Sequence, residues 1–168
     1  MQGLINDLLQ ISQVSSQATS FVRVDTNEAC RAALLNLDGL FKKSATRIEL
    51  GDLPVVMGDP TQITQVFQNL ISNALKYRKE ESPLVTITAQ KKQELREFSF
   101  ADNGIGISPE FHDKIFGIFQ RLHTRNEYPG SGIGLALCKK IIERHRGTIW
   151  LKSVLGTGSI FYFTLPHS

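Results

Sequence analysis

Three groups of residues have the types and spacing that chemistry needs, and the first lies along one edge of an expected helix. If residues 60–76 are helical, Asn69, Asn73 and Lys76 fall within roughly 60° of arc beside an apolar stripe, with Tyr77 at its border. Carboxamide oxygens can ligate a cation, an ammonium can meet a phosphate, and a phenol can cover a flat ring. The plainer interpretation of this pattern alone is a solvated helix face.

The second group directly follows an expected strand over residues 97–101. It contains the carboxylate of Asp102 and the alternating residues Gly104, Gly106 and Ile107. The carboxylate can accept a hydrogen bond from an exocyclic amine, and the glycines permit positive φ angles and a close approach to a flat ligand. An ordinary glycine turn is the alternative.

The third group opens an expected helix over 133–146 and consists of Gly130, Ser131, Gly132, Ile133, Gly134 and Leu135. Glycines at a helix N-terminus present backbone N–H groups to an anion, and the helix dipole helps. The spacing is GxGxG, so neither the dinucleotide fingerprint GxGxxG nor a P-loop is present. Arg121 and Arg125 flank the preceding loop and could reach terminal phosphates.

Hydrophobic periodicity and turn residues predict the elements that must position these groups. Helices are expected over 2–18, 25–43, 60–76 and 133–146, with a short one from 108; strands are expected over 21–24, 47–50, 55–57, 85–90, 97–102, 148–153 and 159–165. Because helices and strands are segregated, we expect an α+β fold, a two-layer sandwich with about three helices on one face of a mostly antiparallel sheet. We divide the chain into a terminal helix (1–18), a linker and first strand (19–24) and one domain (25–168).

Composition excludes several classes of protein. The 168 residues carry a net charge of +3; the first 60 hold 5 basic and 7 acidic residues, and the rest hold 14 and 9. This balance does not indicate a nucleic-acid partner, and it puts any small anionic partner with the later segment. Cys30 and Cys138 have neither zinc nor disulfide spacing. With no membrane span or signal peptide expected, we predict a cytoplasmic protein without membrane contact.

Taken in order, these motifs resemble the catalytic and ATP-binding domain of sensor histidine kinases, in the GHKL or Bergerat-fold superfamily. Asn69–Tyr77 resembles the N box, Asp102–Gly106 and Gly130–Leu137 the two glycine boxes, Phe116–Phe119 the F box, and Gly156–Phe161 the closing glycine motif. The sequence of residues 119–130 is most similar to that of phytochrome-like kinases of bacteria.

The resemblance implies ATP and Mg²⁺ as cofactors and assigns roles to the residues. Asp102 would bind the adenine amine, Thr157 would support the adenine through water, and Tyr77 would lie against the base. Asn73 would ligate Mg²⁺, with Asn69 nearby. Lys76 and Arg121 would contact phosphate oxygens, and residues 120–131 would form a mobile lid. The reaction implied is transfer of the γ-phosphoryl group to a histidine, with Asn69, Lys76 and Arg121 as catalytic residues.

Two departures refine this prediction. ATP-hydrolysing superfamily members place a glutamate four residues before the metal asparagine to activate water; here that position is Asn69, which favours a kinase. Relatives commonly carry His-Gly-Gly where this chain has His145, Arg146 and Gly147, which makes a positive φ at 146 costlier.

The expected partners follow from what the sequence lacks. His112 and Asp113 form the nearest string to a phosphoacceptor motif, but they lie inside the ATP domain without the expected proline. Residues 1–18 therefore resemble the end of a dimerisation helix without its histidine. The partners implied are the phosphoacceptor helix, a response regulator and a second copy in the full-length kinase. A degenerate GHKL interaction module and an anti-sigma type serine kinase are the alternatives.

Overall fold

The computed structural model describes residues 2–16, 19–118, 120 and 132–167. The helices are α1 (Gln2–Ser16), α2 (Thr26–Asn36), α3 (Asp38–Phe41), α4 (Pro60–Lys76) and α5 (Gly134–Arg144), with a 3-10 turn η1 (Pro109–Phe111). The strands are β1 (Val22–Asp25), β2 (Arg47–Leu50), β3 (Val55–Gly58), β4 (Leu84–Lys92), β5 (Leu95–Asp102), β6 (Ile149–Val154) and β7 (Gly158–Pro166).

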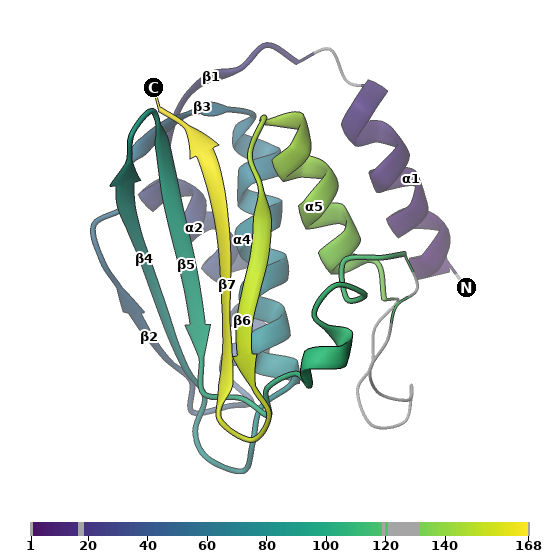
Figure 1. Cartoon of the computed structure of the whole chain (residues 1–168), viewed down its shortest axis with the longest axis vertical. Coiled ribbons are helices and arrows are strands. Elements are labelled where there is room, and N and C mark those ends of the chain that lie inside the picture. Colours follow the sequence, from purple (N-terminus) through teal and green to yellow (C-terminus); the bar gives the residue numbers. More distant parts are fainter. Residues whose placement is uncertain (1, 17–18, 119, 121–131, 168) are drawn as a thin grey trace.

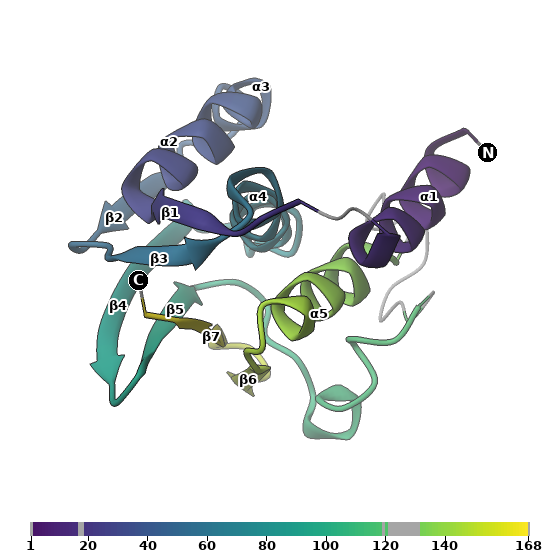
Figure 2. The same cartoon turned by 90° about the horizontal axis from the view of Figure 1, so that it is seen from above.

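Five of the strands form one sheet in the order β2-β4-β5-β7-β6, and helices cover one of its faces (Figures 1 and 2). All neighbours are antiparallel except β2 and β4, which are parallel. This confirms the expected two-layer α+β architecture. The expectation of a single sheet was wrong, because β1 and β3 pair only with each other as a separate ribbon. An isolated bridge between Val56 and His167 ties that ribbon to the end of β7.

The core lies between α4 and the middle of the sheet. Phe67 of α4 is fully buried, and its ring lies 5.9 Å from Phe98, 5.1 Å from Phe100 and 6.0 Å from Phe163, measured between centroids. These three rings come from β5 and β7, in which buried positions alternate with partly exposed ones around Phe98–Phe100 and Phe161–Phe163. The helix that carries the asparagines is therefore fixed against the strand that ends in Asp102.

The expected helix over 25–43 is two helices, because the chain leaves helical geometry at Leu37. The Leu37 backbone has φ −100° and ψ 5°, and its side chain is buried. Asn36, Asp38 and Gly39 surround this position, and all three have low helix propensity. The break lies where α2 meets α3, on the far side of α2 from α5 (Figure 2), and none of residues 37–41 lines the cavity described below.

Helix α1 packs against α5 with one side and presents apolar residues on the other (Figure 2). Ile11 and Val14 are buried, whereas Ile5 and Leu9 are 57% and 52% exposed. Gln65 of α4 donates a 2.9 Å hydrogen bond to Gln10 of α1. The apolar stripe expected for this helix is thus divided between an inner and an outer face. Within the described part of the chain, no helix is long and apolar enough to cross a membrane.

Candidate functional site

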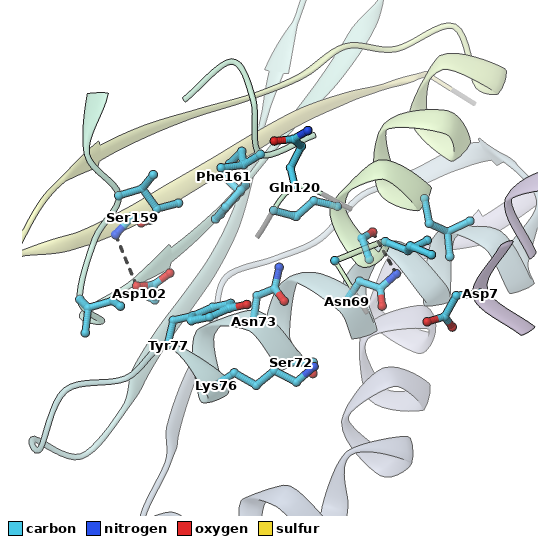
Figure 3. Close-up of a pocket in the computed structure, with 18 of the residues that line it drawn as sticks. Asp7, Asn69, Ser72, Asn73, Lys76, Tyr77, Asp102, Gln120, Ser159 and Phe161 are labelled. Atoms are coloured by element: carbon cyan, nitrogen blue, oxygen red, sulfur yellow. Dashed lines mark hydrogen bonds between the residues drawn. The ribbon is translucent and has the colours of Figure 1, made fainter. Parts of the chain in front are cut away.

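The three groups of residues singled out in the sequence meet around one cavity of about 300 Å³. It lies between α4, the segment after β5, the start of α5 and β7, with α1 at one side (Figure 3). Eleven of the predicted site residues line it: Asn69, Asn73, Lys76, Tyr77, Asp102, Gly106, Ile107, Gly132, Ile133, Gly134 and Leu135. Arg121, Gly130 and Ser131 lie outside the described residues.

The polar edge of α4 forms one wall of this cavity. Asn69, Asn73 and Lys76 occupy successive turns, and Tyr77 follows as the C-terminal cap (Figure 3). Asn69 Nδ2 donates a 3.4 Å hydrogen bond to the carbonyl oxygen of Gly134. This contact joins the N-box helix to the first residue of α5. This edge of α4 therefore lines a cavity and is not the solvated helix face that the pattern alone allowed.

Asp102 lies at the opposite end of the cavity and is held by backbone amides. Its Oδ1 accepts hydrogen bonds from the N–H of Gly104 at 2.9 Å and from the N–H of Ser159 at 3.4 Å. Burial raises the pKa of this carboxyl above its ordinary value, and the two amides partly offset that rise. Among the described residues no hydrogen bond involves Oδ2, so this oxygen remains for a ligand donor.

The glycines after Asp102 let backbone meet backbone, in addition to any approach to a ligand. A Cβ on Gly104 would collide with the carbonyl oxygen of Tyr77, and a Cβ on Gly106 would collide with that of Val154. Gly106 also has φ +73°, which L side chains rarely adopt. Gly104 itself does not line the cavity. The loop over residues 103–107 therefore packs closely between the end of α4 and the β6–β7 turn.

Thr157 is the predicted site residue that the structure moves away from the cavity. It is exposed in the β6–β7 turn and is not among the lining residues. Ser159, two residues later, is buried and lines the cavity beside Asp102 (Figure 3). The reason is where the strand begins: β7 starts at Gly158, so Thr157 belongs to the turn, whereas Ser159 and Phe161 lie in the strand on the side that lines the cavity. Ser159, and not Thr157, is therefore the hydroxyl residue that lines the cavity next to Asp102.

The start of α5 presents backbone N–H groups to the cavity. Ile133 occupies the N-cap position, and an aliphatic side chain cannot accept from the first amides as Ser or Asp would. Gly132 has φ +76°, and Gly134 is the first helical residue. An uncapped helix N-terminus of this kind suits an anion.

The sequence did not point to several lining residues. Asp7 and Gln10 come from α1, and Ile115 and Gln120 come from segments with no chemical motif of their own; Phe161 ends the closing glycine motif but was given no role. The aliphatic and aromatic members give the cavity an apolar floor for a flat ring. Only a tertiary contact brings α1 here, so no spacing within the sequence could have shown it.

The donor set is suited to a hard cation carried by a phosphate ligand. Among the described residues no group of three or more His, Cys, Asp and Glu side chains could hold a metal ion. The Asn73 and Asn69 carboxamides face the cavity instead. Mg²⁺ takes oxygen ligands, keeps several waters and commonly binds through one or two protein groups plus substrate phosphates. The residues present fit such an ion.

Comparison with known proteins agrees with this geometry. The family described as histidine kinase-, DNA gyrase B- and HSP90-like ATPase matches residues 58–168. Cyanobacterial phytochrome A of Nostoc sp. is 52% identical over 99% of the chain, and phytochrome-like protein Cph1 of Synechocystis sp. is 48% identical over 99%. The chain spans 22% of the length of each of these relatives.

Solved structures show the same fold. The catalytic domain of histidine kinase ThkA has a TM-score of 0.75 at 28% identity, covering 88% of this chain and 96% of that one. Full-length ShkA in complex with AMPPNP scores 0.80 at 27% identity, covering 97% and 35%. ThkA in complex with the response regulator protein TrrA scores 0.76 at 27% identity, covering 98% and 47%. With its motifs in family order around one cavity, the chain belongs to the histidine kinase-, DNA gyrase B- and HSP90-like ATPase family, as the ATP-binding catalytic domain of a histidine kinase.

Proposed function

We propose that this domain binds ATP with Mg²⁺ and transfers the γ-phosphoryl group to a histidine on a helix of the full-length protein. The observation that carries the proposal is the different character of the two ends of this cavity. A half-buried carboxylate lies at one end, and an uncapped helix N-terminus with an asparagine edge lies along it. A purine amine and a phosphate chain are the two ends of a ligand that would match both.

The residue roles follow from these positions. Asp102 Oδ2 would accept from the exocyclic amine of adenine, and Tyr77 would lie against the base. Lys76 and the amides of Gly132 and Gly134 would meet phosphate oxygens, as would Arg121, Gly130 and Ser131 by resemblance. A phosphoryl transfer needs mainly positioning and charge neutralisation, and these are the groups that supply both.

Asn73 would hold Mg²⁺, with Asn69 beside it. When bound, the ion would neutralise charge on the phosphates. Asn69 already donates to the Gly134 carbonyl, which turns its carboxamide oxygen away from that contact. A carboxamide has no basic site for a water proton, so transfer to a histidine is favoured over hydrolysis.

The partners we propose are protein segments and proteins other than this chain. Residues 1–18 would be the end of a dimerisation helix, since α1 keeps an exposed apolar side that includes Ile5 and Leu9. A phosphoacceptor helix and a response regulator would be the protein partners, as the complex of ThkA with TrrA illustrates for that kinase. Because ATP is the phosphoryl donor, we propose a cytoplasmic location.

Titration with Mg-ADP, followed by backbone amide chemical shifts, tests this function. We expect the largest shifts at Asp102–Ile107 and Gly132–Leu135. Asp102→Asn replaces a charged acceptor by a neutral one and should weaken binding roughly 10- to 100-fold. Asp52→Asn is the matched control, because Asp52 is exposed and does not line the cavity.

A chain whose amides near Asp102 do not respond to saturating Mg-ADP would contradict the proposal and favour a degenerate interaction module. Phosphorylation of a candidate histidine helix with labelled ATP then identifies the acceptor. Phosphohistidine is labile to acid and phosphoserine is stable, so acid treatment of the product separates the histidine kinase from a serine kinase.

A further inference from the structure

Ser153 of β6 makes three polar contacts with parts of the site that it does not itself line. Its Oγ lies 2.7 Å from the backbone nitrogen of Ile107, 2.9 Å from the carbonyl oxygen of Gly158 and 2.7 Å from Oγ of Ser159. Ser153 and Ser159 are direct partners in the β6–β7 pairing. One hydroxyl therefore joins the loop after Asp102, the closing turn and a cavity-lining serine.

These contacts determine the direction of each hydrogen bond. A serine hydroxyl has one proton and two lone pairs. The Ile107 N–H can only donate, and the Gly158 carbonyl can only accept, so Ser153 gives its single proton to Gly158. Its contact with Ser159 can then be made only if Ser159 donates. All three positions on the Ser153 hydroxyl are filled, and Ser159 has no proton left for the cavity.

Ser159 therefore presents only lone pairs to a ligand. It lines the cavity beside Asp102, and its own N–H donates to Asp102 Oδ1 (Figure 3). Two acceptors, the Asp102 carboxylate and Ser159 Oγ, thus face the same end of the cavity. An amino group with two N–H donors suits such a pair, whereas a carbonyl oxygen meets lone pairs on both.

We propose that Ser153 is a positioning residue that sets the choice of base. It fixes Ser159 as an acceptor, holds the Asp102–Ile107 loop through the Ile107 N–H, and so favours a purine with a 6-amino group over one with a 6-oxo group. This inference rests on the proposed nucleotide binding and deepens it. Ser153 acts through Ser159 and Ile107 rather than by touching the base.

The test compares ADP with inosine diphosphate, which replaces the 6-amino group of adenine by an oxygen. Dissociation constants of both Mg-nucleotides are measured by calorimetry for the unmodified chain and for Ser153→Ala. Without Ser153, the Ser159 hydroxyl is free to turn its proton toward the cavity, and the Ile107 N–H loses its acceptor. We expect ADP to bind roughly tenfold more weakly while inosine diphosphate binds as well as before or better, so the preference for ADP falls by about tenfold.

A matched hydroxyl pair on the other face of the same sheet supplies the control. Thr88 Oγ1 and Ser99 Oγ are also 2.7 Å apart across neighbouring strands, but neither residue lines the cavity. Ser99→Ala should leave both dissociation constants unchanged. Ser153→Thr, which keeps the hydroxyl, should retain the preference for ADP. Ser153→Cys, with a much weaker acceptor of similar shape, replaces Ser153→Ala if the latter does not fold.

The possible outcomes distinguish a failure of this inference from a failure of the proposed nucleotide binding on which it rests. An unmodified chain that binds neither nucleotide overturns the proposed function and the inference with it. An unmodified chain that prefers ADP, with the same preference retained in Ser153→Ala, overturns the inference alone. Equal weakening of both nucleotides also overturns it, because a purely structural role would lower both affinities together.

Discussion

At the scale of single residues, Arg146 shows what local geometry demands at the end of α5. Its φ is +61°, and the hydrogen bonds from Arg146 N to Glu143 O and from Gly147 N to Ile142 O, each 2.9 Å, form a Schellman motif. The position favours glycine, as the departure from His-Gly-Gly suggested. Arginine is accommodated there at a conformational cost.

Arg146→Gly should therefore stabilise the domain. Relief of the left-handed strain outweighs the extra freedom of glycine in the unfolded chain, which gives a gain of about 0.5–1 kcal/mol in the free energy of unfolding. Urea denaturation measures it. Lys139→Gly, on an exposed position inside α5, should instead destabilise by about 1 kcal/mol. A loss of stability in Arg146→Gly would refute this account.

The contrast between Thr157 and Ser159 shows what residue types and spacing could not predict, namely which of two neighbouring hydroxyl side chains lines the cavity. Asp102, Asn73 and the second glycine box were found from residue types and spacing, because each carries a chemical reason of its own. Thr157 was misplaced because the start of β7 decides which side chain points inward, and that start depends on Gly158 and its packing. Thr157 and Ser159 would share a face in a continuous strand, so only the place where the strand begins separates them.

At the scale of elements, the buried His145 connects the end of α5 to the start of α4. Its Nδ1 donates to the Ile141 carbonyl at 2.7 Å, and its Nε2 accepts from the Asp59 N–H at 3.0 Å. The ring stacks on Phe21 at 4.5 Å between centroids, and the Arg144 guanidinium lies 4.9 Å from the centroid of Phe21. The segment after α1 is thus held by both helices that carry the site.

This arrangement predicts a loss of stability in mild acid. Burial, as the main cause, lowers the pKa of His145 below 6.5, with nearby Arg144 adding to the effect and Asp59 opposing it. Between the lowered pKa and about 6.5 the unfolded chain binds a proton that the folded chain does not, so the free energy of unfolding falls as the pH drops below about 6.5. Chemical denaturation at pH 8, 6.5 and 5.5 measures the decline.

His145→Gln removes this titration and should show a shallower decline over the same range, although it is less stable at pH 8. His167→Gln is the matched control, because His167 is exposed and should keep the slope of the unmodified chain. If His145→Gln and the unmodified chain decline equally, His145 is not the titrating group.

The α4 cap shows how far element-level prediction reached. Asp59 followed three residues later by Gln62 predicts a capping box at the start of α4, and the Asp59 side chain does accept from the amides of Thr61 and Gln62. The reciprocal half of the capping box is absent from the described contacts: the Gln62 side chain accepts from Arg144, and the Asp59 N–H goes to His145. The groups that replace the capping-box partners lie more than 80 residues away in the sequence, so local spacing could not indicate them.

At the scale of the whole molecule, Phe67 joins the helical layer to the sheet. Phe67→Ala would leave a cavity among Phe98, Phe100 and Phe163 and should destabilise the domain by about 3–5 kcal/mol, a large part of the stability of most domains. Denaturant unfolding checks this value. Phe41→Ala, on a partly buried residue of α3, should cost clearly less; equal losses would contradict the central role of Phe67.

The layer architecture was predictable because helices and strands are segregated along the chain. The strand order was not, since β5 pairs with β7 across more than 50 residues and β2 lies parallel to β4. Nothing in residues 22–25 or 55–58 indicates that β1 and β3 leave the main sheet for a ribbon of their own. Such pairings depend on packing across the entire domain.

The position of α1 has a consequence for any measurement of nucleotide affinity. Asp7 and Gln10 lie on the wall of the cavity, while Ile11 and Val14 hold the helix against the rest of the domain. Occupancy of the cavity and attachment of α1 are therefore linked equilibria. Whatever factor attachment contributes to the affinity for nucleotide, bound nucleotide contributes the same factor to the attachment.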